Sequence, residues 1–351
     1  MDDEEEEFEK NFLSFKTRID KFQIDHLIGE GGYGQIYDVV DVSVSPNKHY
    51  AMKIEYLDSP KSGLKIESLI LKKIQSSEYF PEYISSGVTD SFRYLVMGLY
   101  GPSLSTVRKQ LNGERFSQYS LFHLGYHMIR CIAELHQKGY IHRDIKPSNF
   151  LVKTDRNSPV VLVDFGLSRS YLYKDSGLHK KARKDPGFIG TVRYSSIHAQ
   201  NNEELSRRDD LISWFYSMIE MAKSKTPWPG NDNKKLAKQL KKSLTKEQLC
   251  EGFPPEFKEI YDLIFNLEYE DEPDYERIQD VLMNIITEAE FKVHQYEWEF
   301  FSKNMVLSIS PIPLYMGEPS DILKPKIVER NISNSESLDF EEEGCAGCII
   351  F

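Results

Sequence analysis

The chain has 351 residues, of which 40 % are hydrophobic and 28 % charged, a composition typical of globular proteins. Its longest apolar runs are far shorter than the ~20 residues of a membrane-spanning helix, and its acidic start lacks the apolar core of a secretory signal. Four cysteines are too few for a disulfide framework, which predicts a reducing, cytoplasmic location. The formal net charge of −11 argues against general nucleic-acid binding, so no nucleic-acid partner is expected.

Acidic residues are concentrated near both ends of the chain. Residues 2–9 contain seven of them, and five more lie between 336 and 343. Such runs are usually solvated and disordered. We therefore predict a disordered lead over residues 1–21, one large domain over 22–300, and a flexible tail over 301–351.

The first part of this domain has the pattern of a small antiparallel sheet with one helix. Alternating apolar residues predict two strands within 22–37, joined by a glycine-rich turn, and a third strand over 50–54. Residues 64–74 repeat apolar side chains at a period of 3.6 and are expected to be helical. A short buried strand is expected at 94–97.

From residue 103 onward the pattern becomes mostly helical. An apolar stripe over 121–135, ended by Gly139, predicts one long helix. A second helix opens at Ser206 with the Ser-x-x-Asp spacing of a capping box. Further elements are expected as a strand at 160–163 and helices at 261–267 and 278–286. A sheet-rich part followed by a helical part predicts the α+β class.

The polar run over 140–150 reads Tyr-Ile-His-Arg-Asp-Ile-Lys-Pro-Ser-Asn-Phe, between two apolar stretches. An H-R-D-x-x-x-x-N spacing is typical of the catalytic loop in phosphoryl transfer. It predicts Asp144 as the base that accepts or orients the substrate hydroxyl and Asn149 as a metal ligand. Lys146 is predicted to neutralise the transferring phosphoryl group. His142 is expected to pack and hydrogen-bond within the loop.

Residues 29–34 carry three glycines in a G-x-G-x-x-G spacing, which lets the backbone approach phosphate groups without interference from Cβ atoms. Dinucleotide-binding folds share the spacing, but there the loop opens a helix. Here residues 35–39 continue as a strand, which favours a phosphate-binding hairpin. A glycine-rich hairpin without a ligand remains the alternative.

Two charged residues occupy positions where charge is costly. Lys53 lies in an apolar strand, and Glu67 lies on the apolar stripe of the following helix. An ion pair between them would aim Lys53 at the α- and β-phosphates of a nucleotide. The alternative is a surface lysine and a glutamate at the edge of the stripe.

Asp164 directly follows the predicted strand at 160–163, which places it at a strand end. With Asn149 it is predicted to hold Mg²⁺, a cation that prefers oxygen ligands. A simple turn after a strand is the alternative, but the position of Asp164, 20 residues beyond Asp144, argues against chance.

Together, these ordered motifs resemble the eukaryotic protein kinase family over about residues 22–300. Within that family the chain is most similar to the casein kinase I group, and in particular to its tau-tubulin kinase branch. The runs that carry this resemblance are 31–38, 142–150, 187–194, 207–211 and 254–257.

The resemblance implies a bilobal fold with an N-lobe over 22–97 and a C-lobe over 98–300. It implies a serine/threonine kinase that transfers the γ-phosphate of ATP, with Mg²⁺, to hydroxyl groups of protein substrates. Met97 would be the gatekeeper, residues 98–100 the hinge that meets adenine, and Asp210 the brace beneath the catalytic loop. The implied nucleotide site consists of Ile28, Gly29, Glu30, Gly31, Gly32, Tyr33, Gly34, Gln35, Ile36, Ala51, Lys53, Glu67, Met97 and Leu99.

Three positions depart from the general kinase pattern. Most kinases place Ala-Pro-Glu after the activation segment, but residues 195–197 read Ser-Ser-Ile, as the casein kinase I group also lacks that motif. His198 replaces the asparagine expected in the group, and Gly98 replaces an acidic or amide residue at the first hinge position. Gly98 is expected to loosen the hinge. None of the three removes a catalytic group.

Basic residues between 167 and 191 exceed acidic ones by four, and lysines of 234–246 add to them. If they converge beside the active site, acidic or phosphorylated peptides would be preferred as substrates. The proposed anion site consists of Lys180, Lys181, Arg183 and Arg193. A solvated basic loop is the alternative.

The last four residues, Cys348 to Phe351, fit the C-a-a-X pattern of prenylation, and the terminal phenylalanine favours a geranylgeranyl group. A prenyl group at Cys348 would allow membrane association, although one lipid anchors only weakly. The alternative is an apolar tip without a lipid. A catalytically weak pseudokinase or a membrane-tethered scaffold is the competing class of function, against which the intact set of charged residues argues.

Overall fold

The computed structural model describes residues 12–289 and 295–300, apart from 32–33 and 60–61. The predicted tail with Cys348, and the glycine-loop residues Gly32 and Tyr33, therefore lie outside the described residues. Within the described part, no helix combines the length and the apolar character that crossing a membrane requires.

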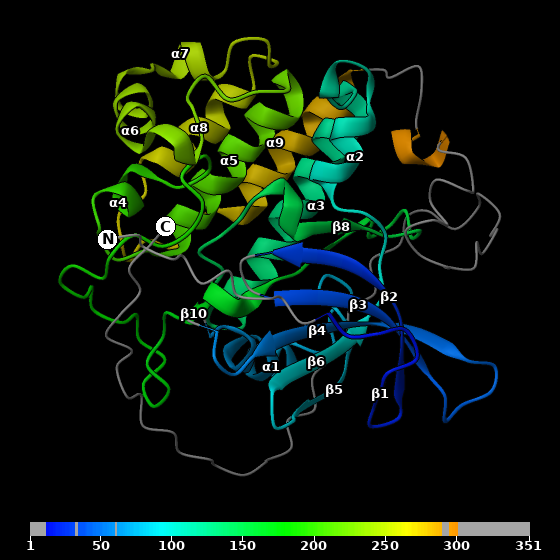
Figure 1. The fold of residues 1–351 in the computed structure, drawn as a ribbon. Helices are drawn as coiled ribbons and strands as arrows, with labels where there is room; N and C mark the ends of the chain where they lie inside the picture. The colour runs from blue at the N-terminus through cyan, green and yellow to red at the C-terminus, as the bar shows by residue number, and fades with distance from the viewer. Residues whose placement is uncertain (1–11, 32–33, 60–61, 290–294, 301–351) are drawn as a thin grey trace, which may run out of the picture.

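A curved six-stranded antiparallel sheet forms the N-terminal part (Figure 1). In spatial order its strands are β1 (Arg18–Ile19), β2 (Phe22–Gly31), β3 (Gly34–Asp41), β4 (Lys48–Tyr56), β6 (Phe92–Gly98) and β5 (Tyr83–Val88). The helix α1 (Leu64–Lys73) follows β4 and contacts the turn η3 (Phe165–Leu167) of the second part.

Alternation along β4 decides which side chains face which part of the molecule. Met52 and Ile54 are fully buried in a core on one face of the sheet, where burial of each such side chain contributes about 1.5–3 kcal/mol. Ala51 points to the opposite face and belongs to the core shared with α1 and the helical part. Lys53 shares that face, because side chains two residues apart lie on the same side of a strand.

The C-terminal part is built around α3 (Gln118–Gln137) and α5 (Arg207–Lys223), with α9 (Tyr275–Glu288) packed on α3 and α8 (Phe257–Phe265) packed on α5 (Figure 1). Trp214 of α5 is fully buried and donates its Nε1–H to the Gly125 carbonyl of α3 over 3.1 Å. The shorter helices are α2 (Leu104–Gln110), α4 (Ile197–Gln200), α6 (Lys234–Ser243) and α7 (Lys246–Leu249).

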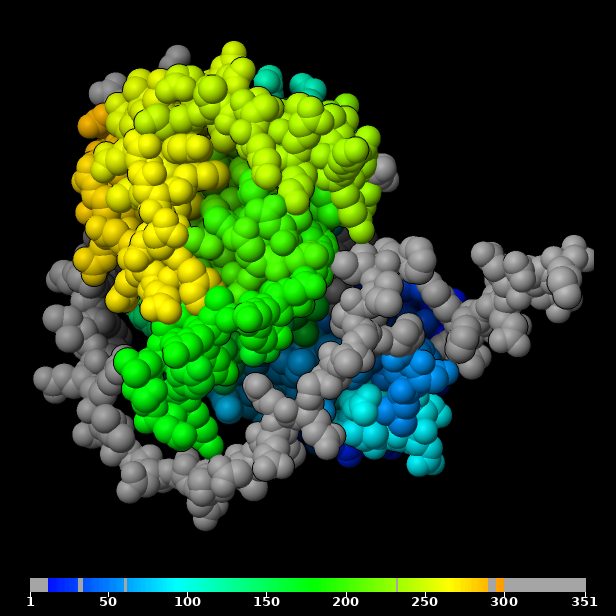
Figure 2. All heavy atoms as spheres, turned by 90° about the vertical axis from the view of Figure 1, so that its left-hand side faces the viewer, coloured from blue at the N-terminus to red at the C-terminus, as the bar shows by residue number. Residues whose placement is uncertain are grey.

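Two small strand pairs lie where the sheet meets the helices. The strand β7 (Tyr140–Ile141) pairs with β10 (Arg169–Ser170), and β8 (Phe150–Val152) pairs with β9 (Val160–Leu162). They hold the polar run of residues 142–149, which ends in the turn η2 (Pro147–Asn149). The remaining short turns are η1 (Asn112–Glu114), η4 (Asn231–Asn233) and η5 (Glu297–Phe300). Figure 2 shows the green segment after β10 projecting below the yellow-green helices.

The α+β prediction is confirmed, and the strongly periodic elements fall close to their predicted bounds. The helix predicted over 64–74 is α1, and the apolar stripe over 121–135 lies within α3. The strand β5 was not predicted, because its sequence Tyr-Ile-Ser-Ser-Gly-Val lacks alternation. It forms as an edge strand because β6 offers it a hydrogen-bonding partner.

The predicted disordered lead needs correction over its last ten residues. Residues 18–19 form β1, which pairs with β2, and the backbone N–H of Leu13 donates to the Tyr37 hydroxyl over 3.0 Å. Ile19 is buried in the core of the sheet, and this apolar contact orders the segment. The acidic residues on which the prediction of disorder rested lie only at the start of this segment, within residues 2–9.

Candidate active site

The catalytic loop is held from below by a buried carboxylate. Asp210 of α5 accepts hydrogen bonds from the backbone N–H groups of His142 and Arg143 over 2.6 and 2.8 Å. The His136 Nε2 atom of α3 lies 2.9 Å from the same carboxylate. Burial alone would raise the pKa of Asp210, but these donors outweigh it and lower the pKa. Asp210 therefore stays charged and fixes the loop, as the resemblance implied.

Backbone strain at Arg143 is part of this arrangement. Its φ of 69° lies in the left-handed region, which costs about 1–3 kcal/mol for a residue with a Cβ atom. The Asp210 bond and a bond from Arg143 Nε to the Leu167 carbonyl over 2.6 Å hold it there. His142 packs its ring on Phe165 and contacts the Val163 carbonyl, the packing role expected for it.

Asp144 sits at the centre of a small polar network. Lys146 Nζ donates to Asp144 Oδ2 over 2.6 Å, and the Thr191 hydroxyl donates to Asp144 Oδ1 over 2.8 Å. Lys146 also donates to the Thr191 hydroxyl over 3.1 Å. Asn149 Nδ2 donates to the Asp144 carbonyl over 2.9 Å, which turns its amide oxygen to other partners. Three predicted site residues and Thr191 thus come together.

A pocket opens beside this network. It is lined in part by Asp144, Ile189, Thr191, Tyr194 and Ser195. The catalytic-loop carboxylate and the segment that follows residue 188 therefore line the same small pocket.

Lys53 is shared by two carboxylates. Its Nζ atom lies 2.7 Å from Glu67 Oε2 and 2.8 Å from Asp164 Oδ1, and the Glu67 side chain is only 2 % exposed. Burial lowers the pKa of Lys53, but the two carboxylates outweigh it and raise the pKa overall. Burial raises the pKa of Glu67. Burial would also raise the pKa of Asp164, but the attraction of Lys53 outweighs it and lowers that pKa. The predicted ion pair is present and includes Asp164.

Asp164 and Asn149 provide the donor set for a divalent cation. The strand pair β8–β9 brings them together, because the Val163 N–H donates to the Asn149 carbonyl over 2.9 Å. One ammonium group against two carboxylates leaves a negative charge uncompensated. A carboxylate and an amide oxygen suit Mg²⁺, which completes its shell with water and phosphate oxygens.

The glycine-rich turn joins β2 and β3, with Gly31 opposite Gly34 in the register. Gly34 has a φ of 118°, and a Cβ atom there would come within 1.9 Å of the Ile54 carbonyl oxygen. A Cβ atom at Gly29 would meet nothing closer than 3.8 Å. The fold therefore requires glycine at position 34 but not at position 29, where the predicted approach of a phosphate would be a separate reason for glycine.

We expect Gly34→Ala and Gly29→Ala to fail in different ways. The first strains the hairpin and should lower the melting temperature of the protein, whereas the second should leave it within about 2 °C. Gly29→Ala should instead weaken ATP binding roughly 5- to 20-fold, a loss of about 1–2 kcal/mol of affinity. Differential scanning fluorimetry and nucleotide titration measure the two effects, and unchanged ATP affinity in Gly29→Ala would contradict the phosphate role.

The implied adenine site is assembled on β4 and β6. Ala51 is the cross-strand partner of Met97, and both side chains are buried. Ile28, Ile36 and Leu99 are half-buried and pack against the main core. At Gly98, a Cβ atom would lie 2.9 Å from the Tyr100 hydroxyl, which accepts the Glu82 N–H over 3.1 Å. A Cβ atom at position 98 would therefore require the Tyr100 ring to shift.

Two of the proposed anion-site residues form ion pairs with carboxylates of the same chain. Arg183 forms an ion pair with Glu204, and Arg193 Nη1 lies 2.7 Å from Glu220 Oε1. Lys181 is exposed and Lys180 half-buried. The Arg193 side chain is 39 % exposed and belongs to the same segment as Thr191. Two of the four charges are therefore already compensated by internal carboxylates.

His136 is a site residue that sequence reasoning missed. Its ring bridges the Tyr275 hydroxyl, 2.6 Å from Nδ1, and the Asp210 carboxylate. The available signal was a histidine at the end of an apolar stripe, which is also what an ordinary core histidine shows. Its function depends on α5 and α9, which sequence spacing does not place.

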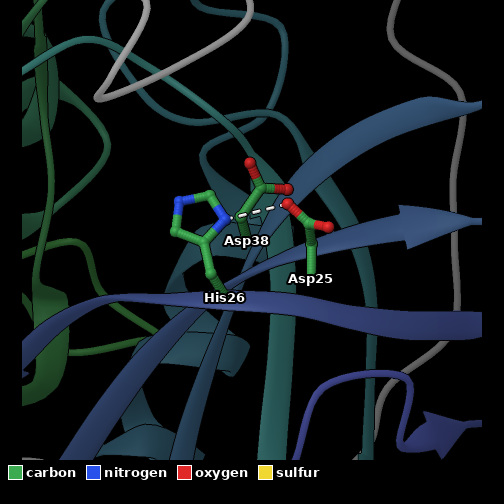
Figure 3. Close-up of side chains that lie close together, drawn as sticks. All are labelled: Asp25, His26 and Asp38. Carbon is green, nitrogen blue, oxygen red and sulfur yellow. Dashed lines mark hydrogen bonds and ion pairs between the residues drawn. The ribbon is translucent and has the colours of Figure 1, made fainter.

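A second group of ligand-type side chains lies on strands β2 and β3 (Figure 3). Asp25, His26 and Asp38 bring their ligating atoms within 4.8 Å of one another. His26 Nδ1 lies 2.9 Å from Asp25 Oδ2, and His49 Nδ1 lies 2.7 Å from Asp38 Oδ1. Each carboxylate thus has a histidine partner, and we assign no metal ion to the group.

Comparison with known proteins identifies the family. The profile described as "Protein kinase domain" matches residues 22–290. A probable serine/threonine-protein kinase of Dictyostelium discoideum is 36 % identical over 276 residues, covering 78 % of this chain and 55 % of that protein. The serine/threonine-protein kinase spe-6 of Caenorhabditis elegans is 30 % identical over 289 residues, covering 80 % of this chain and 76 % of that protein. The chain thus spans little more than half of the first of these relatives. The chain belongs to the protein kinase family.

Proposed function

We propose that this protein is an active serine/threonine protein kinase of the casein kinase I group, closest to its tau-tubulin kinase branch. The observation that carries the proposal of activity is the contact of the Asp144 carboxylate with both Lys146 and Thr191. The serine/threonine relatives support the choice of acceptor. The Ser-Ser-Ile run at 195–197 supports the group.

In the proposed reaction, the hydroxyl of a protein substrate approaches Asp144 and donates a hydrogen bond to its carboxylate. As its oxygen bonds to the γ-phosphorus of ATP, the bond from that phosphorus to the β,γ-bridging oxygen breaks and ADP leaves. Asp144 takes the hydroxyl proton. Lys146 neutralises charge on the transferring group, and Lys53 holds the α- and β-phosphates.

The family uses ATP and a divalent metal ion, which we propose to be Mg²⁺ held by Asn149 and Asp164. A bound cation would supply positive charge that offsets the charge of the phosphates. The competing class, a pseudokinase or tethered scaffold, lacks support in the site, because Lys53, Glu67 and Asp164 already form the phosphate clamp.

One transfer assay tests the proposed activity. Purified protein is incubated with γ-labelled ATP and Mg²⁺, with casein and with the protein itself as acceptors. We expect label on serine and threonine, identified by phosphoamino-acid analysis. No transfer to either acceptor, in protein that binds ATP, would support the pseudokinase class instead.

We further propose a preference for acidic or already phosphorylated peptides, through Lys180, Lys181, Arg183 and Arg193. Arg193 directly precedes Tyr194, which lines the pocket beside Asp144. Arg193→Ala should reduce kcat/KM for a phosphorylated peptide at least 5-fold more than for its unphosphorylated form. A peptide library assayed with the wild-type protein and the Arg193→Ala variant measures this ratio. An equal loss of kcat/KM on the phosphorylated and unphosphorylated peptides would refute the preference.

We propose that Cys348 carries a prenyl group and that the protein is cytoplasmic with partial membrane association. The support is the C-a-a-X sequence alone. Intact-mass spectrometry of protein from its native cells should show the added isoprenoid and the loss of three residues. A free thiol at Cys348 in that material would end the proposal.

A further inference from the structure

One lysine of the basic helix α6 points into the protein. Lys234, Lys235 and Lys242 are exposed, whereas Lys241 is only 6 % exposed. Its Nζ atom donates to the Val192 carbonyl over 2.8 Å and to the Ser195 carbonyl over 2.7 Å. It also lies 4.7 Å from the ring centre of Tyr216 and 5.1 Å from that of Trp228. The sequence assigned this lysine to a basic surface, and the structure corrects that assignment.

Among the described residues, no carboxylate forms an ion pair with Lys241; Glu220 pairs with Arg193 and Asp209 with Arg208. Burial lowers the pKa of Lys241 to about 6. A charged ammonium group has three N–H donors and a neutral amine has two, so both carbonyl bonds persist in either state. The contribution of Lys241 is therefore hydrogen bonding to backbone, in a site that its two aromatic neighbours shield from water.

The segment that Lys241 holds is the one that reaches Asp144. Thr191 begins a turn in which the N–H groups of Tyr194 and Ser195 donate to its carbonyl over 3.0 and 2.9 Å. The hydroxyl of Thr191 donates to Asp144. Lys241 binds both sides of this turn, at residues 192 and 195. The turn cannot shift relative to the helical part without breaking those two bonds.

Neighbouring contacts fasten the same turn, and they come from the same region. Trp228 Nε1 donates to the Arg193 carbonyl over 2.8 Å, and the Tyr194 hydroxyl donates to Glu220 over 2.6 Å. Lys238 of α6 reaches the Gln200 carbonyl at the end of α4 over 2.9 Å. The helices α4 and α6 lie side by side in Figure 1. Lys241 is the member of this set that binds two carbonyls of the turn at once.

We propose that Lys241 is a positioning residue for the peptide substrate: it holds residues 192–195 so that Thr191 stays on Asp144 and the acceptor hydroxyl is oriented correctly. The proposal rests on the kinase function proposed above. It separates α6 from nucleotide binding, because Lys53 lies on β4, Glu67 lies on α1, and Asp164 directly precedes η3.

Lys241→Met tests the proposal, since it keeps the apolar stem and removes the donors. We expect kcat/KM for a peptide substrate to fall about 10- to 100-fold, mostly through a higher peptide KM. The ATP dissociation constant should stay within twofold. Lys258→Met, at an exposed position of α8, is the matched control and should retain both values. Equal peptide kcat/KM in the two variants, or an equal loss of ATP binding and peptide turnover in Lys241→Met, would overturn the proposal.

Wild-type protein supplies a second readout that does not depend on a variant folding. Under reductive methylation of the native protein, Lys242 should be labelled rapidly and Lys241 at least tenfold more slowly, as measured by peptide mass spectrometry. Labelling of both at one rate would show that Lys241 is not held on the carbonyls. A wild-type enzyme that is protected at Lys241 but transfers no phosphate would instead refute the kinase function and leave the anchor intact.

Discussion

Asp144→Asn should reduce phosphate transfer by roughly 10²- to 10⁴-fold, the range associated with loss of a general base. The amide has nearly the same shape as the carboxylate, so the bond from Thr191 can persist. It accepts no proton at neutral pH, and it places a neutral group against the Lys146 ammonium, which now lies 2.6 Å from Asp144 Oδ2. The effect should therefore fall on kcat rather than on nucleotide affinity.

Steady-state transfer to casein or a peptide, together with ATP titration, measures both quantities. Asp90→Asn, at an exposed position in the turn between β5 and β6, is the matched control and should behave as wild type. Retention of more than a tenth of wild-type kcat in Asp144→Asn would remove the base role. A parallel loss of ATP binding would indicate a structural defect instead.

Lys53→Met should abolish detectable transfer and also destabilise the protein. The substitution leaves Glu67 and Asp164 facing one another without the cation that each now contacts. Breaking a buried ion pair by removing one partner costs roughly 3–5 kcal/mol. Denaturant unfolding of the variant, with Lys73→Met on the exposed face of α1 as control, measures the loss. Unchanged stability would show that the three charges are not coupled.

The destabilisation by Lys53→Met should depend on pH in a defined direction. Burial already raises the pKa of Glu67, and Lys53 holds the pKa of Asp164 down. Without Lys53 both folded-state pKa values rise above those of the unfolded chain. A carboxyl group with a raised folded pKa loses stability as the pH rises from its unfolded pKa through its folded pKa. The variant should therefore be closer to wild type at pH 5 than at pH 8, and the opposite order would contradict this account.

Local sequence was sufficient for the catalytic loop, because its chemistry is carried by residues within one short run. Asp144, Lys146 and Asn149 lie within six positions, and their mutual contacts follow from a single turn. The Lys53–Glu67 pair was also predictable, since an unpaired charge on each apolar element is costly. The participation of Asp164 in that pair was not, because it needs β9 to end beside α1.

The anion site shows that sequence alone could not distinguish a free basic surface from a basic segment paired with carboxylates. The excess of four positive charges between 167 and 191 does not reveal which carboxylates pack against them in the folded protein. Glu204 and Glu220 lie 21 and 27 residues beyond their arginine partners, on segments that only the packing of α5 brings close. A charge count therefore overestimates the free charge of a surface.

Sequence by itself determined the class of chemistry and the α+β order of elements, and it named a candidate base, because short motifs and periodic burial are local properties of a chain. Tertiary structure alone decided what supports that chemistry. His136 contacts Asp210, 74 residues along the chain, and Lys241 binds the carbonyls of residues 192 and 195, which lie 49 and 46 residues before it. Their roles depend on which buried donor meets which backbone acceptor, and only the packed helices fix that pairing.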